Sequence, residues 1–340
     1  MRKQMTSYDV ASRAGVSRSV VSAVLNGTAG IRVSEQTRRA VMLAVEELGY
    51  RIDAQARAMR TRRSQCLAAY GSLESPFFLQ MLQGFQRKCA SSGYHVLLYD
   101  SAERDSREEL LDLFRQRRID GIVTKDSTQF DSAIWEETVN RHAIPYVSVE
   151  GFPENARIAS VLIDYGESIR LAMDYIRRSI GMPPIYVQLY TGPDNQPNWG
   201  DRQRLAAYER WMRDHGYDPL VLSLPDTPWE LDEIVWTKWL ADLHKPMACL
   251  VNWSRGAVRI YRAALRLGLA VGKDVFVMAA DNSEQVNRHL VPILSAVEVP
   301  YREMGEAAAV RLIEYATGAR GMDDTANVWL HAKLTPGESV

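Results

Sequence analysis

The sequence predicts an α/β fold in which a small N-terminal helix-turn-helix head of three helices precedes a two-lobed core of parallel sheets. Residues 1–63 hold 12 Lys/Arg against 5 Asp/Glu, and the remainder holds 29 against 37, so a basic head (+7) is joined to an acidic body (−8). Apolar residues of the head recur at helical spacing. In the body, short apolar runs alternate with helical stretches, which is typical of parallel sheets covered by helices.

Three capped helices are predicted within the head, residues 1–50. Thr6-Ser7-Tyr8-Asp9 has the form of a capping box, and Gly15 suits the left-handed position after the first helix. Ser17 caps a second helix that ends at Asn26-Gly27. Ser34 opens a third helix, which Gly49 stops. In a helix-turn-helix unit, the second helix enters the major groove of DNA.

The N-terminal residues of that second helix are the candidates for reading bases. They are Ser17, Arg18 and Ser19, and Ala23, one turn further on, could touch a thymine methyl group. Arg18 can bond guanine O6 and N7 together, or it can hold a phosphate, since phosphates take at least half of protein–DNA hydrogen bonds. Further phosphate contacts are expected from Thr6, Ser7, Ser22 and Asn26.

The sequence of the body predicts a regular succession of strands and helices. The expected strands are Leu67–Tyr70, Val96–Tyr99, Gly121–Thr124, Tyr146–Val149, Ser160–Ile163, Ile185–Leu189, Leu220–Leu222, Ala248–Val251 and Val275–Ala280. The expected helices include Gln80–Ser92, Ser106–Arg117, Ser132–Arg141, Gly166–Ile180, Arg202–His215 and Trp253–Leu267. This length exceeds what one hydrophobic core usually carries, so we expect two lobes.

Strand ends point to a ligand cleft between these lobes. Ligands of parallel sheets bind outside the carboxyl ends of the strands. Each strand-end residue could instead only cap a loop or a helix, as Asp281 could for a segment starting near Ser283. The candidates are Ser72, Lys125, Glu150, Asn252 and Asp281.

The segments TSYDVASRAGVSRSVVSAVLNG, VSEQTRRAV and EELGYRIDAQARAMR resemble the headpiece of the LacI/GalR (lactose/galactose repressor) family, and the similarity continues through almost the whole chain. The resemblance implies a periplasmic-binding-protein-like core over 66–340 whose effectors are mostly sugars and other small polar metabolites. It places the N-lobe at about 66–161 and 292–322, and the C-lobe at about 162–291 and 323–340.

The resemblance also implies a hinge over 51–65 that folds when two subunits meet over DNA. Met59 matches the apolar side chain that the family wedges into the minor groove, which unstacks one base step. Arg57 and Arg60 would then hold phosphates. The head departs from the family pattern at Ala23, Gly30-Ile31-Arg32 and Ile52-Asp53, which bears on the operator sequence.

The same resemblance selects effector-binding residues. Arg204 and Asp281 match residues that hold the effector in the family, and Glu150 stands where an aspartate is common. Phe77 and Phe78 match an aromatic segment on the pocket side. Arginine donors facing carboxylates suit a polyhydroxylated ligand, because each hydroxyl both donates and accepts.

Two tryptophans leave the pocket open to interpretation. The family's Asn-Asp pair is Asn252-Trp253 here, so a carboxylate is replaced by an indole. Trp253 could stack on a sugar ring or pack against the next helix, and Trp199 poses the same choice. The effector could therefore be unusual, or the response to an effector could be lost.

Other function classes find little support in the sequence. No GxSxG, HExxH, Walker A or GxGxxG motif occurs, the six histidines are scattered and the three cysteines form no CxxC pair, so we expect no enzyme, metal or cofactor. No signal peptide or membrane-spanning run is apparent, which predicts a cytoplasmic protein without membrane association.

We therefore expect a transcription regulator, acting as a repressor, that binds palindromic double-stranded DNA as a homodimer. Two alternatives stay open. A transport-type sugar-binding receptor would need a signal peptide and no basic head. A DNA-binding dimer could use its core only as a scaffold without an effector.

Overall fold

A computed structural model provides the structure of the chain. It describes residues 5–26, 32–50, 63–101, 107–126, 130–190, 197, 199–225 and 229–340. The chain forms two compact units, Met1–Ser64 and Gln65–Val340.

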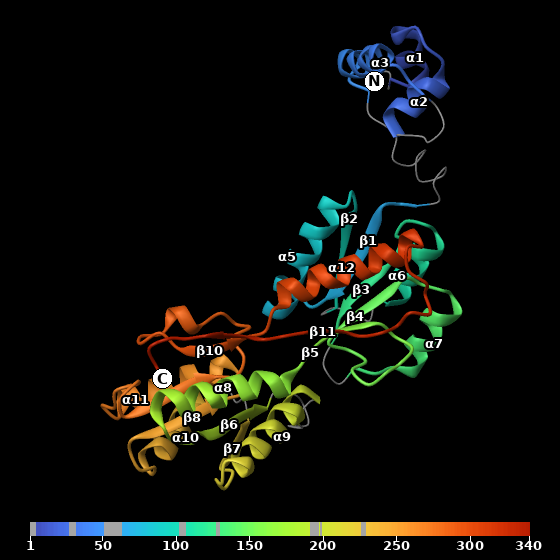
Figure 1. The fold of residues 1–340 in the computed structure, drawn as a ribbon. Coiled ribbons are helices and arrows are strands. Elements are labelled where there is room, and N and C mark those ends of the chain that lie inside the picture. The colour runs from blue at the N-terminus through green and yellow to red at the C-terminus, as the bar shows by residue number, and fades with distance from the viewer. Residues whose placement is uncertain are drawn as a thin grey trace. The chain divides into compact units, whose positions relative to one another are not determined.

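The first unit is a three-helix head, as predicted, with α1 (Ser7–Ala14), α2 (Arg18–Asn26) and α3 (Glu35–Leu48) (Figure 1). Thr6 and Ser34 cap α1 and α3, and Thr6 forms the predicted capping box with Asp9. Gly15 and Gly49 follow these helices with φ of 65° and 59°, a conformation that costs glycine little. Apolar faces of the three helices meet in one core made of Val10, Ala11, Val21, Val24, Val41 and Ala44.

The second unit contains two six-stranded sheets. The N-lobe sheet is entirely parallel in the order β11-β5-β4-β3-β1-β2. Its strands are β1 (Cys66–Gly71), β2 (His95–Asp100), β3 (Ile122–Lys125), β4 (Tyr146–Val149), β5 (Ser160–Ile163) and β11 (Val328–Leu330). Its helices are α5 (Pro76–Ser91), α6 (Arg107–Arg115), α7 (Ala133–Arg141) and α12 (Tyr301–Thr317).

The C-lobe sheet has the order β12-β10-β9-β8-β6-β7, and only β12 is antiparallel to its neighbour. Its strands are β6 (Ile185–Tyr190), β7 (Val221–Pro225), β8 (Met247–Val251), β9 (Val275–Ala279), β10 (Ser295–Glu298) and β12 (Lys333–Thr335). Its helices are α8 (Tyr165–Ile180), α9 (Trp199–Asp214), α10 (Trp229–Ala241), α11 (Ser254–Arg266) and the 3-10 turn η1 (Asn287–His289).

The chain crosses between the lobes at places that differ from the expected boundaries. The segment from 292 was expected to begin the second N-lobe portion, but β10 pairs with β9 in the C-lobe sheet. The segment from 323 was expected in the C-lobe, but β11 pairs with β5 in the N-lobe sheet. A short strand joins the sheet whose edge strand is free to pair with it. The composition of a three- or four-residue strand does not encode which sheet that is.

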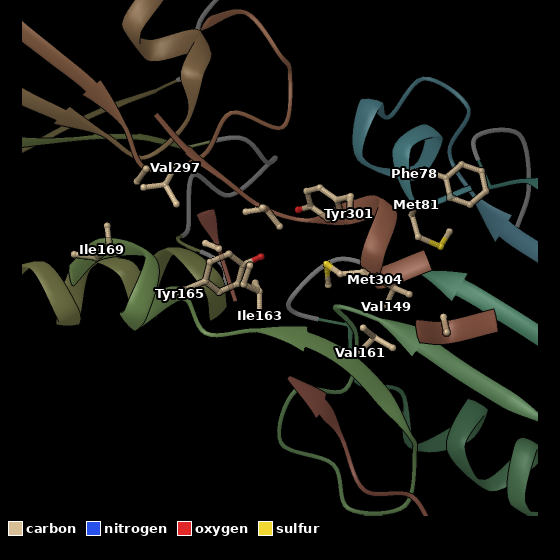
Figure 2. Close-up of a cluster of buried hydrophobic side chains, with 14 of the residues drawn as sticks. Phe78, Met81, Val149, Val161, Ile163, Tyr165, Ile169, Val297, Tyr301 and Met304 are labelled. Atoms are coloured by element: carbon tan, nitrogen blue, oxygen red, sulfur yellow. The ribbon is translucent and has the colours of Figure 1, made fainter. Parts of the chain in front are cut away.

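Alternate residues of each strand face opposite layers of helices. In the N-lobe, Ala69 and Val123 face α5 and α12, whereas Ala68 and Ile122 face α6 and α7. The former layer continues into the C-lobe, so one apolar cluster runs from Phe78 and Met304 to Val297 and Ile169 (Figure 2). This shared core is what holds the two lobes against each other around their common cleft.

The helices α5 and α12 lie side by side on the N-lobe sheet (Figure 1). Two glycines permit the close approach, because a β-carbon on Gly84 would lie 1.9 Å from the carbonyl oxygen of Arg302, and one on Gly305 would lie 2.0 Å from that of Met81. Helix α5 begins four residues before the predicted start, with Ser75 as its cap and Pro76 in the first turn. Within the described residues, no helix combines the length and apolar character needed to cross a membrane.

Candidate functional site

The N-terminus of α2 presents an exposed polar surface on the head. Ser17, Arg18 and Ser19 are all exposed, and the Ser17 hydroxyl accepts from the amide of Val20 at 3.4 Å. The hydroxyls of Ser17 and Ser19 lie 2.7 Å apart. Arg18 is the first residue of α2, so its guanidinium extends from the end of the helix that carries unpaired amides and positive dipole charge.

The other residues predicted to contact DNA are less exposed or already hydrogen-bonded, or lie outside the described residues. The Thr6 hydroxyl donates to Asp9 Oδ2 at 2.7 Å, so it is already used in the cap, while Ser7 and Ser22 are half-buried. Ala23 is only 4% exposed, so its methyl group offers little surface to a thymine, and its predicted base contact stays a prediction. The side chain of Asn26 and the hinge residues Arg57, Met59 and Arg60 lie outside the described residues.

In the core, a cavity of about 290 Å³ lies between the lobes. Eight of the ten predicted effector residues line it, namely Ser72, Phe77, Phe78, Lys125, Glu150, Arg204, Trp253 and Asp281. Sequence reasoning missed six further lining residues, namely Ser75, Ser101, Asp126, Tyr165, Arg255 and Tyr301. Ser101 and Asp126 directly follow β2 and β3, so the strand-end rule could have found them.

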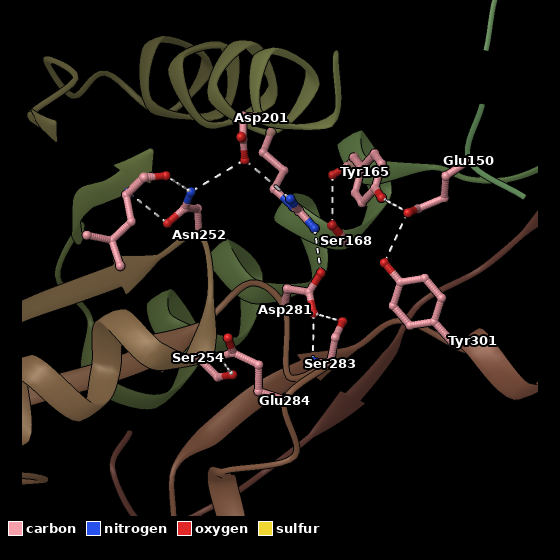
Figure 3. A network of polar contacts seen from close by, with 12 residues as sticks. Glu150, Tyr165, Ser168, Asp201, Asn252, Ser254, Asp281, Ser283, Glu284 and Tyr301 are labelled. Atoms are coloured by element: carbon pink, nitrogen blue, oxygen red, sulfur yellow. Dashed lines mark hydrogen bonds and ion pairs between the residues drawn. The ribbon is translucent and has the colours of Figure 1, made fainter. Parts of the chain in front are cut away.

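On the N-lobe side, Glu150 is the centre of a buried polar cluster (Figure 3). Lys125 Nζ lies 2.7 Å from Glu150 Oε2, and the hydroxyls of Tyr165 and, at 3.1 Å, Tyr301 donate to Oε1. Burial alone would raise the pKa of Glu150, but the Lys125 ammonium and these donors hold its pKa below the ordinary value. Glu150 has φ of 68°, a left-handed conformation that turns its carboxylate from the end of β4 into the cavity.

On the C-lobe side, Arg204 of α9 is 3% exposed and is held by two carboxylates. Its Nη2 donates to Asp281 Oδ2 at 2.7 Å, and its Nη1 lies 3.5 Å from Asp201 Oδ1. The guanidinium also lies over the ring of Tyr165, 4.2 Å from its centroid. Burial opposes the charge of Arg204, but Asp281 and its neighbours keep its pKa above the ordinary value.

Asp281 combines a local and a long-range role. Its Oδ1 accepts from the amide of Ser283 at 2.7 Å and from the Ser283 hydroxyl, which is the local capping contact considered from the sequence. Its Oδ2 is left for Arg204. Burial raises the pKa of Asp281, and the Arg204 cation opposes that shift.

Two predicted effector residues lie away from this cavity. Asn252 is fully buried, and its side-chain amide exchanges two 2.9 Å hydrogen bonds with the main chain of Leu189. Its Nδ2 also lies 3.4 Å from Asp201, so Asn252 positions the carboxylate that holds Arg204 (Figure 3). Trp199 borders a second cavity and donates to Glu154 at 3.2 Å.

Aromatic rings form the apolar part of the cavity wall. Phe77 and Tyr301 are stacked with centroids 5.3 Å apart, and Lys125 Nζ lies 5.9 Å from each ring. Trp253 both lines the cavity and packs partly on the C-lobe core, and its stacking on a sugar ring stays a prediction. The Arg255 guanidinium lies 4.6 Å from the Trp253 ring.

Each charged side chain among the described lining residues has an opposite charge beside it. Lys125 pairs with Glu150 and Arg204 with Asp281, as described above. Asp126 accepts from Arg107 at 2.8 Å, and Arg255 lies 3.5 Å from Glu284. The buried Nε of Arg204 has no hydrogen-bond partner among the described residues. The arrangement suits a neutral ligand that both donates and accepts hydrogen bonds.

Comparison with protein families matches almost the whole chain to three family models. Residues 6–53 match the model of bacterial regulatory proteins of the lacI family. Residues 64–227 match the model of periplasmic binding proteins and the sugar binding domain of the LacI family, and residues 185–340 match a periplasmic binding protein-like domain.

Individual proteins resemble the chain over the same extent. It is 26% identical to the HTH-type transcriptional repressor PurR of Proteus mirabilis (strain HI4320), covering 98% of this chain and 96% of the relative. The fold matches the lac repressor dimer bound to operator and the anti-inducer ONPF, with a TM-score of 0.77, 21% identity and 99% coverage of both chains. It also matches a complex of the regulator CelR with cellobiose, with a TM-score of 0.65, 22% identity and coverage of 99% and 100%.

Proposed function

We propose that the chain binds an inverted-repeat operator as a homodimer and responds to a neutral, polyhydroxylated effector such as a sugar. The proposal starts from the family of the chain, which belongs to the LacI family of bacterial regulatory proteins and is a DNA-binding repressor, not an enzyme. The observation that carries the effector class is the internal pairing of every charged group lining the cavity. Among the described residues that line the cavity, an anionic effector would find no cation without a carboxylate beside it, whereas hydroxyls can bond to both members of each pair.

The size of the cavity fits this class. Ligand pockets measure roughly 300–1,000 Å³, so a cavity of about 290 Å³ lies at the small end of this range and suits a small ligand. The stacked pair of Phe77 and Tyr301 and the indole of Trp253 offer flat apolar faces to a ring. A cavity of this composition is the feature that a core serving only as a scaffold would not need.

The effector proposal is tested by thermal unfolding of the full chain with a panel of neutral sugars and the corresponding sugar phosphates. We expect at least one neutral sugar to raise the melting temperature, and its phosphate to raise it less. Asp281→Asn should abolish the shift, whereas Asp242→Asn, an exposed aspartate just after α10, should leave it unchanged. A shift that survives Asp281→Asn would refute the site, and a response to phosphates alone would refute the ligand class.

For DNA, we propose that Arg18 reads a base. Operator fragments selected from random inverted repeats should bind the full chain, and Arg18→Ala should weaken that binding by about 1–3 kcal/mol while hardly affecting random DNA. Arg39→Ala removes the same charge from the exposed surface of α3, where it faces Glu35 at 3.9 Å, and serves as the matched control. Equal losses on operator and random DNA would show that Arg18 holds only a phosphate.

A further inference from the structure

A second cavity, of about 400 Å³, lies beside α8 and α9 and is separate from the effector cavity apart from the shared residue Tyr165. One side is formed by α8 and the residues before it, the other by one face of α9, and Trp329 of β11 completes the wall. The lining residues are Ile163, Asp164, Tyr165, Gly166, Arg170, Trp199, Gln203, Ala206, Ala207, Arg210 and Trp329. Asp164 and Trp329 stand at or next to two of the crossings between the lobes.

The charges of this cavity differ from those of the effector cavity. Arg170 of α8 and Arg210 of α9 both line it and are exposed, and within the described part of the chain neither has a carboxylate within ion-pair distance. Among the described lining residues the one carboxylate is that of Asp164, which caps α8 by accepting from the amide of Glu167 at 2.8 Å. Its charge is thereby directed to the positive end of the helix, so two guanidinium groups remain to attract an anion.

The apolar part of the wall is aromatic. The indole of Trp329 is 47% exposed on β11, the edge strand of the N-lobe sheet. Exposure of this apolar ring to water contributes little to stability. Trp199 meets the ring of Tyr165 edge to face, with centroids 6.0 Å apart. The small residues Gly166 and Ala207 face each other where α8 and α9 approach, since a β-carbon on Gly166 would lie 3.9 Å from that of Ala207.

We propose that this cavity binds an aromatic anion, that is, a planar ring carrying a carboxylate or a phosphate. The ring lies against the indoles of Trp199 and Trp329, where stacking on an aromatic face is favourable. The anionic group lies between Arg170 and Arg210, whose forked donors match the two oxygens of a carboxylate or phosphate. The site therefore selects the charge that the effector cavity disfavours.

The test is calorimetric titration of the full chain with two probes of this class, adenosine 5′-monophosphate and indole-3-acetate. Adenosine supplies a ring without the anion, and inorganic phosphate supplies the anion without a ring. We expect at least one aromatic anion to bind about tenfold more tightly than either fragment, because each charge-assisted hydrogen bond is worth roughly a factor of ten.

Variants assign that binding to the cavity. Arg170→Gln with Arg210→Gln should weaken it by about tenfold or more. The matched control, Arg177→Gln with Arg213→Gln, removes the same charge from exposed positions of the same two helices and should change it by no more than about twofold.

The Asp281→Asn variant separates this site from the effector cavity and should bind the aromatic anion as the parent does. The proposal is overturned if neither probe binds more tightly than its fragments. It is equally overturned if the Arg170/Arg210 variant binds like its control, or if Asp281→Asn abolishes the binding.

Discussion

Replacing Arg204 with Met should destabilise the core by about 3–5 kcal/mol at neutral pH, the usual cost of removing one partner from a buried ion pair. The guanidinium is buried and lies within 2.7 Å of Asp281 and 3.5 Å of Asp201. Unit charges about 4 Å apart attract by about 4 kcal/mol at an effective dielectric constant near 20, so the pairing with Asp281 alone accounts for a loss of this size. Methionine keeps much of the apolar packing on Tyr165, so the loss reports chiefly the missing charge.

The size of this loss should depend on pH. In the variant, burial still raises the pKa of Asp281 and the Arg204 cation no longer opposes that shift. A folded-state pKa above the unfolded value means that the folded protein takes up protons first as the pH falls. The variant therefore regains stability relative to the parent as the pH falls from 7 through the raised pKa of Asp281.

Tryptophan fluorescence during urea unfolding measures this free energy for the core alone, because all eight tryptophans lie within Gln65–Val340. Arg213→Met on the same helix breaks an exposed 3.0 Å pair with Glu209 and should cost no more than about 0.5 kcal/mol. The reasoning fails if the free energies of unfolding of Arg204→Met and of that control differ by no more than about 1 kcal/mol. It also fails if the stability that Arg204→Met loses relative to the parent is the same at pH 5 and pH 7.

Three further substitutions test other parts of the structure. Glu150→Gln should lower the free energy of unfolding at neutral pH. Because the pKa of Glu150 is lowered in the folded protein, its ionised form stabilises the fold above pH 4.5, and the difference between variant and parent should narrow as the pH falls below that value. Chemical unfolding of both proteins at pH 3 to 7 measures this difference. Gly84→Ala should destabilise the core by about 1–3 kcal/mol through its clash with the Arg302 carbonyl, whereas Gln86→Ala on the exposed face of α5 should not. Gly15→Ala should cost the head about 1 kcal/mol at its φ of 65°, seen as faster amide exchange confined to that unit.

Local signals in the sequence predicted much of the fold. Capping residues and helix-ending glycines located the head helices, because a cap is a contact within four residues of the chain. The rule that ligands gather at strand ends brought Lys125, Glu150 and Asp281 to one cavity without knowledge of the pairing. The helices α10 and α12 and the strands β10, β11 and β12 were not predicted. Helix α10 follows the alternation, between β7 and β8, whereas β10, β11 and β12 are strands of only three or four residues that come after it.

The residues that sequence reasoning misplaced or missed depend on long-range packing. Asn252 follows β8 as a strand-end residue should, but its amide is taken by the main chain of Leu189, 63 residues away. Tyr165 and Tyr301 open helices directly after lobe crossings, so no strand-end rule selects them, and only the assembled lobes bring their hydroxyls to Glu150. Burial of Ala23 likewise depends on the neighbouring helices and not on the pattern of α2.

The contacts across the effector cavity predict how easily the lobes shift. The ion pairs of Lys125 and Arg204 each stay within one lobe, whereas Gln80 of α5 reaches the C-lobe by donating to the Ser283 carbonyl at 2.6 Å. One such neutral hydrogen bond is worth about 0.5–1.5 kcal/mol, within reach of the 1–3 kcal/mol that typically couples two sites. Gln80 also accepts from Gln285 Nε2 at 3.2 Å, an exposed second bond to the C-lobe. Gln80→Ala should therefore move the effector concentration that half-saturates the DNA response by about twofold or more. Gln83→Ala, which removes a 2.9 Å bond to Arg302 within the N-lobe, should leave it unchanged, and equal shifts in both variants would exclude this contact as part of the coupling.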